Sequence, residues 1–134
     1  RVRHLMGEQQ MSRAKQKGTL AETAVVRYLR DALGDTEGTI HRETLHGSRD
    51  IGDVSGVRIH GERCVIEVKN RKEYALKEWL GEAQVEAGNA DATYYVVAFK
   101  PVRVTSPGDY MVLTDLRTFA RIAGHGVIGA DDAE

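Results

Sequence analysis

The chain has 134 residues, of which 41% are hydrophobic and 29% charged, and its formal net charge is −1. This length suits one domain with a buried core, and no apolar run approaches the ~20 residues of a membrane span. The near-zero charge excludes a protein that simply coats nucleic acid, and the single cysteine, Cys64, excludes an internal disulfide. We therefore expect a soluble, cytoplasmic domain without a membrane partner.

The two ends of the chain differ from its middle in charge. Basic side chains dominate the first 18 residues, and the last six, "GADDAE", are acidic. We predict a flexible basic leader over residues 1–16, a single domain over residues 17–125 and an acidic tail over residues 126–134.

Helical and strand patterns alternate along the domain. From residue 20 to residue 33 the apolar side chains follow one helical face, which Gly34 ends. Residues 39–45 predict a short strand, and residues 51–70 predict a β-hairpin. A second amphipathic helix is expected at residues 76–87, with Gly88 and Asn89 ending it.

The remaining segments complete an alternating order. Residues 92–100 form a strongly apolar run that predicts a buried strand, and residues 110–113 predict a last short strand. Thr114 or Asp115 is expected to cap a helix that runs through residue 122. The order α-β-β-β-α-β-β-α predicts an α/β fold with helices flanking a mixed central sheet.

The predicted hairpin carries charged residues among apolar ones. Side chains alternate faces along a strand, so Asp53 falls on an apolar face, and Glu67 and Lys69 share a face with Val65. Charged residues are rarely buried unless they are paired or bind a metal. Asp50 has the opposite parity to Asp53, so we expect it to be a loop or edge residue.

The register of the hairpin decides whether these charges meet. A three-residue loop at residues 60–62 would place Asp53 opposite Lys69. Glu67 would then be the diagonal neighbour of Asp53 on the same face. A two-residue loop without a bulge would send Asp53 and Glu67 to opposite faces. We expect the three-residue loop, because Gly61 suits its left-handed position.

A third carboxylate comes from the first predicted helix. Glu22 lies at the margin of the buried stripe, from which it can reach the sheet. Carboxylate oxygens suit Mg²⁺, for which Mn²⁺ can substitute, and such a cation activates water and neutralises charge on a phosphate. Lys69 would lie beside that water or the developing charge. The alternative interpretation is a simple ion pair of Glu67 and Lys69 on a solvent face.

Three segments, "KGTLAETAVVRYLRDAL", "GSRDIGDVSGV" and "VIEVKN", together resemble the PD-(D/E)xK nuclease superfamily. Within it they look most like the archaeal and phage-type Holliday-junction resolvases and resolvase-like small phage nucleases. The resemblance covers residues 17 to about 100. It implies a restriction-endonuclease-like αβββαβ core, divalent-metal-dependent phosphodiester cleavage and a homodimer, in a bacterial or archaeal cell or a phage-infected host.

The resemblance also implies roles for individual residues. Glu22 would be the helical acid, Asp53 and Glu67 would be metal ligands assisted by Glu22, and Lys69 would be the catalytic lysine. The sequence departs from the motif at one position, because Gly52 rather than proline precedes Asp53.

Other polar residues near the proposed site are candidate DNA contacts. Ser48 matches a loop serine that resolvases place near the scissile phosphate, and Gln84 matches an accessory polar residue of the second helix. Basic residues near strand ends would contact phosphates without reading sequence, and these are Arg49, Arg71, Lys72, Lys100 and Arg103. Glu82 and Glu86 are expected to be surface charges, and Trp79 is expected to be a core residue.

The sequence thus favours a metal-dependent DNA endonuclease that cuts branched DNA such as a Holliday junction. No sequence-reading domain is evident in the chain, which favours structure-selective cutting. Two alternatives stay open. One is a restriction or repair nuclease acting on duplex or single-stranded DNA, and the other is a catalytically idle DNA-binding module of the same fold.

Overall fold

A mixed sheet forms the centre of the computed structural model, which describes residues 2–44 and 50–124, with side chains at Arg13 and from residue 15 onward. The strand order is β1-β2-β4-β5-β6, and β3 pairs with β4. Strands β4 and β5 are parallel, and the other pairs are antiparallel. The strands are β1 (His41–Arg42), β2 (Val54–Ser55), β3 (Arg58–Ile59), β4 (Glu62–Lys69), β5 (Tyr94–Phe99) and β6 (Met111–Leu113). The predicted α/β class with a mixed sheet is confirmed.

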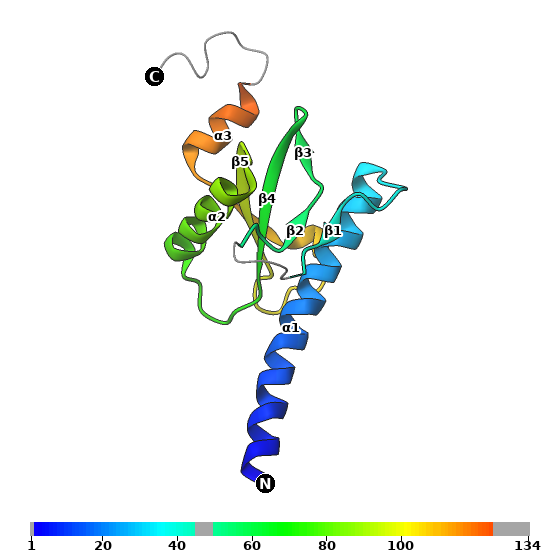
Figure 1. Ribbon diagram of the computed structural model, residues 1–134, viewed down its shortest axis with the longest axis vertical. Coiled ribbons are helices and arrows are strands. Elements are labelled where there is room, and N and C mark those ends of the chain that lie inside the picture. Colours follow the sequence, from blue (N-terminus) through cyan, green and yellow to red (C-terminus); the bar gives the residue numbers. More distant parts are fainter. Residues whose placement is uncertain (1, 45–49, 125–134) are drawn as a thin grey trace.

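Helices cover both faces of this sheet (Figure 1). Helix α1 (Val2–Leu33) packs Val25 and Val26 against the face of β4 that carries Ile66. Helix α2 (Leu76–Ala90) packs Trp79 against the opposite face, which carries Val65. A short 3₁₀ helix η1 (Pro107–Asp109) precedes β6, and helix α3 (Leu116–Ala123) follows it. Strand β4 is therefore buried on both faces, as its apolar sequence predicts.

The helix boundaries differ from the predicted ones at two places. Helix α1 begins at Val2, so most of the segment assigned to a leader belongs to this helix, whose first half extends away from the sheet (Figure 1). Helix α2 continues through Gly88 and Asn89 and ends at Ala90, where Asp91 adopts a left-handed φ of 54°. The predicted stop at Gly88 is wrong, since glycine within a helix is tolerated at a modest cost.

Helix α3 begins as the sequence predicts. The Asp115 carboxylate accepts a hydrogen bond of 2.8 Å from the Thr118 N–H, which is the geometry of an N-cap. The predicted tail at residues 126–134 lies outside the described residues. No described helix is long and apolar enough to cross a membrane.

The hairpin turns more tightly than predicted. Ile59 pairs with Glu62, so the loop contains only His60 and Gly61. Both loop residues have positive φ, 53° and 81°, as a two-residue type I′ turn requires. The predicted three-residue loop is therefore wrong.

A β-bulge compensates for the shorter loop. The Cys64 N–H donates to the Val57 carbonyl, whereas Val54 already pairs with Ile66, so residues 55–56 together lie opposite one residue of β4. Gly56 occupies the bulge at φ +95°, with Thr39 O only 2.1 Å from where a Cβ would lie. The bulge shifts the register by one, which places Asp53 opposite Glu67. The predicted pairing of Asp53 with Lys69 is therefore wrong, although Asp53 and Glu67 do adjoin each other.

Candidate active site

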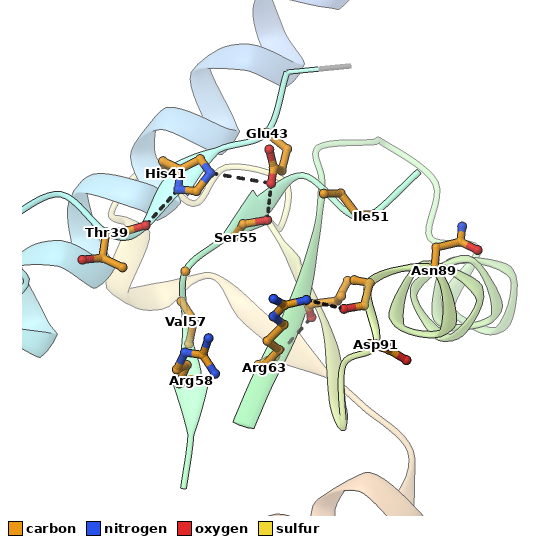
Figure 2. Close-up of a pocket in the computed structure, with 14 residues that line it drawn as sticks. Thr39, His41, Glu43, Ile51, Ser55, Val57, Arg58, Arg63, Asn89 and Asp91 are labelled. Atoms are coloured by element: carbon orange, nitrogen blue, oxygen red, sulfur yellow. Dashed lines mark hydrogen bonds and ion pairs between the residues drawn. The ribbon is translucent and has the colours of Figure 1, made fainter. Parts of the chain in front are cut away.

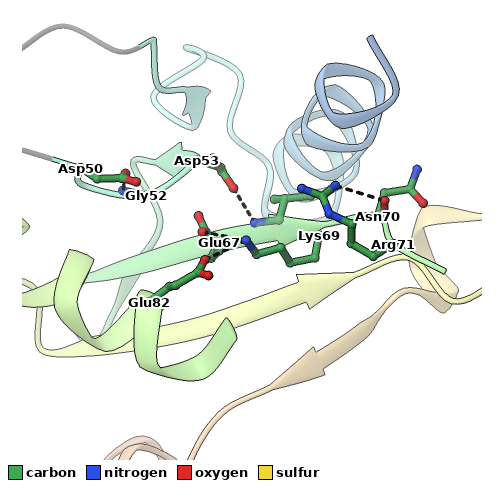
Figure 3. Close-up of polar contacts among 9 residues, drawn as sticks. Asp50, Gly52, Asp53, Glu67, Lys69, Asn70, Arg71 and Glu82 are labelled. Carbon is green, nitrogen blue, oxygen red and sulfur yellow. Dashed lines mark hydrogen bonds and ion pairs between the residues drawn. The ribbon is translucent and has the colours of Figure 1, made fainter. Parts of the chain in front are cut away.

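The predicted site lies where β2 ends beside β4. The Asp53 N–H donates to the Ile66 carbonyl at 3.0 Å, and the Asp53 carboxylate accepts from the Val68 N–H at 2.8 Å. The Asp53 carboxylate thus accepts a β4 backbone hydrogen bond of the kind that a further residue of β2 would accept with its carbonyl. Figure 3 shows Asp53 above β4, close to Glu67 and Lys69. The backbone of β4 therefore fixes the first carboxylate.

Glu67 is almost completely buried and adjoins Asp53. Its exposed fraction is 5%, and burial raises its pKa to about 10. A hydrogen bond with Asp53 and the negative charges of Asp53 and Glu86 contribute to this rise, and the charge of Lys69 opposes it. Two carboxylates hydrogen bond only when one of them holds a proton, so the metal-free pair retains a proton at neutral pH.

Lys69 lies between Glu67 and helix α2. Its Nζ is 3.4 Å from Glu67 Oε2 and 2.8 Å from Glu82 Oε2, and its side chain is 14% exposed. Burial lowers the pKa of Lys69. The hydrogen bond to Glu82 and the charges of both glutamates raise it by more, so the pKa of Lys69 is raised overall. The lysine is therefore held as a cation, and Glu82 is its partner rather than an isolated surface charge.

Glu22 approaches from the opposite face of the sheet. Helix α1 carries it directly after Ala21 of the core on that face, and its Oε1 is 3.1 Å from Arg42 Nε of β1. Burial raises the pKa of Glu22, the charge of Asp53 raises it further, and Arg42 lowers it. Asp53 thus lies between two acids, Glu22 on the α1 side and Glu67 on the α2 side.

Glu86 is a member of this cluster that the sequence analysis assigned to the surface. It is 4% exposed, and burial together with the charge of Asp50 raises its pKa to about 8, while a side-chain hydrogen bond with Glu67 lowers it. The predicted surface charge is wrong. Residues 79, 83, 86 and 87 share one buried helical stripe, so Glu86 lies seven residues after Trp79 on the same face. That spacing was the signal available in the sequence.

Asp50 and Gly52 shape the approach to Asp53. Asp50 is an exposed loop residue, as predicted, and its Oδ1 accepts from the Gly52 N–H at 3.0 Å. Gly52 has a φ of +97°, and a Cβ there would lie 2.8 Å from Val65 Cγ1. Proline is restricted to a φ near −65°, so it could not adopt this conformation. The presence of Gly52 where the motif has proline therefore has a steric reason.

The donor set suits a hard divalent cation. Glu67 Oε1 and Glu86 Oε1 are buried and receive no hydrogen bond from any donor group among the described residues. Oxygen atoms of this kind are the ligands that Mg²⁺ and Mn²⁺ prefer. Within residues 2–44 and 50–124, however, no three His, Cys, Asp or Glu side chains are already arranged to hold a metal ion. Binding would require the shared protons to leave and the carboxylates to turn toward one another.

The predicted DNA contacts are distributed unevenly. Arg71 and Lys72 are exposed directly beyond β4, and the Lys100 N–H donates to the Lys69 carbonyl at 3.0 Å. These cations therefore lie at the Lys69 end of the site. Gln84 is exposed on α2, and Arg103 is exposed on a loop. Ser48 and Arg49 lie outside the described residues.

Trp79 is a core residue, as the sequence predicts, and Cys64 is also in the core. Trp79 is 5% exposed and its ring packs against Phe99 at a centroid distance of 5.6 Å. Cys64 is buried on the α1 face, where burial raises its thiol pKa to about 12. Neither residue contributes to the candidate site. Comparisons of the chain with family models, curated proteins and solved structures find no match.

Proposed function

We propose that this protein is a divalent-metal-dependent endonuclease that hydrolyses phosphodiester bonds in DNA. The observation that carries the proposal is the pair of half-buried Asp53 and buried Glu67 beside Lys69, at a strand end where the Val68 N–H holds the Asp53 carboxylate. A protein gains no stability from burying several carboxylates without donors, because their desolvation is not compensated. Such a cluster is typical of a functional site.

Each residue then has a defined task. Asp53 and Glu67 would hold Mg²⁺, with Glu22 assisting from the α1 side and Glu86 supporting Glu67 from the α2 side. The bound cation supplies an activated water and charge neutralisation at the phosphate. Lys69, held as a cation by Glu82, would orient the attacking water or stabilise the charge that develops on the phosphate oxygens.

The proposed substrate is branched DNA, including four-way junctions, cut by a homodimer in the manner that the resolvase resemblance implies. The exposed cations that follow β4, Arg71 and Lys72, support a phosphate backbone passing the Lys69 end of the site. Phosphate contacts of this kind position a nucleic acid without reading its sequence.

Side-by-side cleavage of labelled four-way junction, flap, duplex and single-stranded DNA, with Mg²⁺ or Mn²⁺, tests the proposal. We expect metal-dependent cleavage with branched DNA cut fastest, and no cleavage by Glu67→Gln. Glu78→Gln makes the same chemical change at an exposed position of α2 and should cleave like wild type. Absence of cleavage together with absence of Mn²⁺ binding by calorimetry would instead indicate the idle DNA-binding module.

A further inference from the structure

A cavity of about 500 Å³ lies beside the candidate active site, between β1 and β2 on one side and the C-terminal end of α2 on the other. Figure 2 shows His41, Glu43 and Ser55 at one end of the cavity and Arg58 and Arg63 at the other. The volume lies within the range of cavities that hold small organic groups, roughly 300–1,000 Å³. The two ends therefore differ in chemistry.

Two arginines of adjacent strands form the cationic end. Arg58 and Arg63 are direct cross-strand partners, so their positive charges face each other on one side of the β3–β4 ribbon. Like charges at such positions are destabilising. Each arginine donates one NH1 hydrogen bond to a backbone carbonyl, and within the described residues neither forms an ion pair. Their remaining N–H donors are available to a ligand that carries negative charge, and guanidinium groups match phosphate well.

The other end of the cavity presents a hydrogen-bond acceptor. Glu43 Oε2 accepts from the Ser55 hydroxyl at 2.6 Å and lies 3.6 Å from His41 Nε2. These contacts hold the Glu43 carboxylate in place, since its side chain is only 23% exposed. A fixed carboxylate recognises amino groups, such as the exocyclic amino group of a cytosine base. Asp91 is a further carboxylate of the lining.

The cavity and the candidate active site lie on the same face of β4. Arg63 precedes Glu67 by four residues, which corresponds to about 13 Å along a strand. Even residue spacing puts both side chains on one face. The Glu43 N–H also donates to the Asp53 carbonyl at 2.8 Å, so the acceptor end is bonded directly to the segment that carries Asp53. One nucleic-acid strand can therefore reach both places.

We infer that this cavity binds a single unpaired nucleotide of the strand that is cut, with its phosphate on Arg58 and Arg63 and its base amino group toward Glu43. A base can enter such a cavity only after leaving the stack, which favours unpaired segments over intact duplex. This inference rests on the proposed function, because it takes the nucleotide to belong to the DNA strand that the enzyme cuts. It goes beyond that function by assigning the substrate an unpaired nucleotide next to the scissile phosphate.

Binding by the full chain without metal, in EDTA, tests the cavity separately from cleavage. Fluorescent oligo(dC), oligo(dT) and duplex DNA are titrated, and anisotropy is measured. The Arg58→Gln/Arg63→Gln double variant should bind oligo(dC) at least ~10-fold more weakly, and the exposed control Arg27→Gln should lose less than ~2-fold. Wild type should prefer oligo(dC) to oligo(dT), and Glu43→Gln should abolish this preference, because cytosine offers an exocyclic amino donor and thymine does not.

The outcomes separate the two proposals. Arginine-dependent binding without cleavage under any metal condition would remove the nuclease function and leave the nucleotide site in place. Normal cleavage together with equal losses in the Arg58→Gln/Arg63→Gln and Arg27→Gln variants would overturn the nucleotide site alone. Free deoxycytidine monophosphate that binds as tightly as oligo(dC) would overturn the assignment to a strand. Duplex binding as tight as oligo(dC) binding would overturn the requirement for an unpaired nucleotide.

Discussion

Two groups of carboxylates in this protein have opposite electrostatic environments. Asp35 and Asp115 each accept backbone hydrogen bonds, from Thr39 and Ile40 and from Thr118 respectively. The hydrogen bond from Ile40 is the main cause that lowers the pKa of Asp35. Partial burial would raise the pKa of Asp115, but hydrogen bonds from Tyr95 and Thr118 lower it. These carboxylates are supplied with donors and stabilise local structure.

Glu67 and Glu86 lie in the contrasting region. Each is buried, each has an oxygen without a donor, and burial raises the pKa of both, to about 10 and about 8. The comparison teaches that this fold can supply donors to carboxylates, yet it leaves Glu67 Oε1 and Glu86 Oε1 without a donor among the described residues. A cluster that destabilises the metal-free fold is expected to be retained for a function.

The largest expected effect is on cleavage. Glu67→Gln keeps the shape of the side chain and mimics the protonated acid, so it should reduce cleavage at least ~1,000-fold by removing a charge that the metal needs. The metal-free variant should unfold at the same denaturant concentration as wild type or a higher one. Destabilisation by the ~3–5 kcal/mol typical of a broken buried ion pair would mean that Glu67 is structural.

Asp53 and Asp50 provide a matched pair for the same region. Asp53→Asn should abolish cleavage as Glu67→Gln does, whereas Asp50→Asn should cleave within a few-fold of wild type, because Asp50 lies in an exposed loop. Single-turnover assays with saturating Mn²⁺ measure both variants. The reverse result would show that the loop aspartate holds the metal.

A pH series distinguishes the two groups of carboxylates through stability. Folding raises the pKa of Glu67 from 4.5 to about 10, so between these values the folded state holds a proton that the unfolded state has released. Stability is then present at low pH and lost as pH rises, by up to about 1.4 kcal/mol per pH unit for each proton held. Urea denaturation of metal-free protein at pH 6 and pH 8 should show this loss. Glu67→Gln should reduce it, and an unchanged pH dependence would contradict the assignment to Glu67.

Gly52 tests the backbone that supports the cluster. Gly52→Ala places a side chain at a φ of +97° and 2.8 Å from Val65 Cγ1, so it should cost about 1–3 kcal/mol of stability and lower cleavage. Gly61→Ala is the control, because its φ is also positive but no atom lies within 4 Å of the added Cβ. Chemical denaturation should show a larger loss for Gly52→Ala. Equal losses would mean that φ alone, without the close approach to Val65, is responsible.

The smallest effect on cleavage is expected for the carboxylates that accept backbone hydrogen bonds, Asp35 and Asp115. Asp115→Ala removes the N-cap of α3 and should cost about 1 kcal/mol of stability. Cleavage should be unchanged when it is measured well below the unfolding transition. A loss of cleavage as large as that of Asp53→Asn would mean that the two groups of carboxylates are not functionally distinct.

The sequence by itself determined the local features of this protein. Alternation along residues 62–69 placed Glu67 and Lys69 on the face of Val65, because strand parity is a local property of the backbone. Helical spacing put Ala21 and Val25 in the core, and a cap at Thr114 or Asp115 followed from residue type at a helix start. Each of these features depends only on residues a few positions apart.

The tertiary structure alone decided how the charges meet. The hairpin has a two-residue loop, and Asp53 faces Glu67 only because a bulge at Gly56 offsets the register, which depends on the close approach of Thr39. Glu86 joins the cluster because α2 packs its stripe against β4, and the cavity beside it exists because the bulge and the end of α2 lie side by side. Contacts between segments far apart in the chain set burial and register, so strand parity and helical spacing could not supply them.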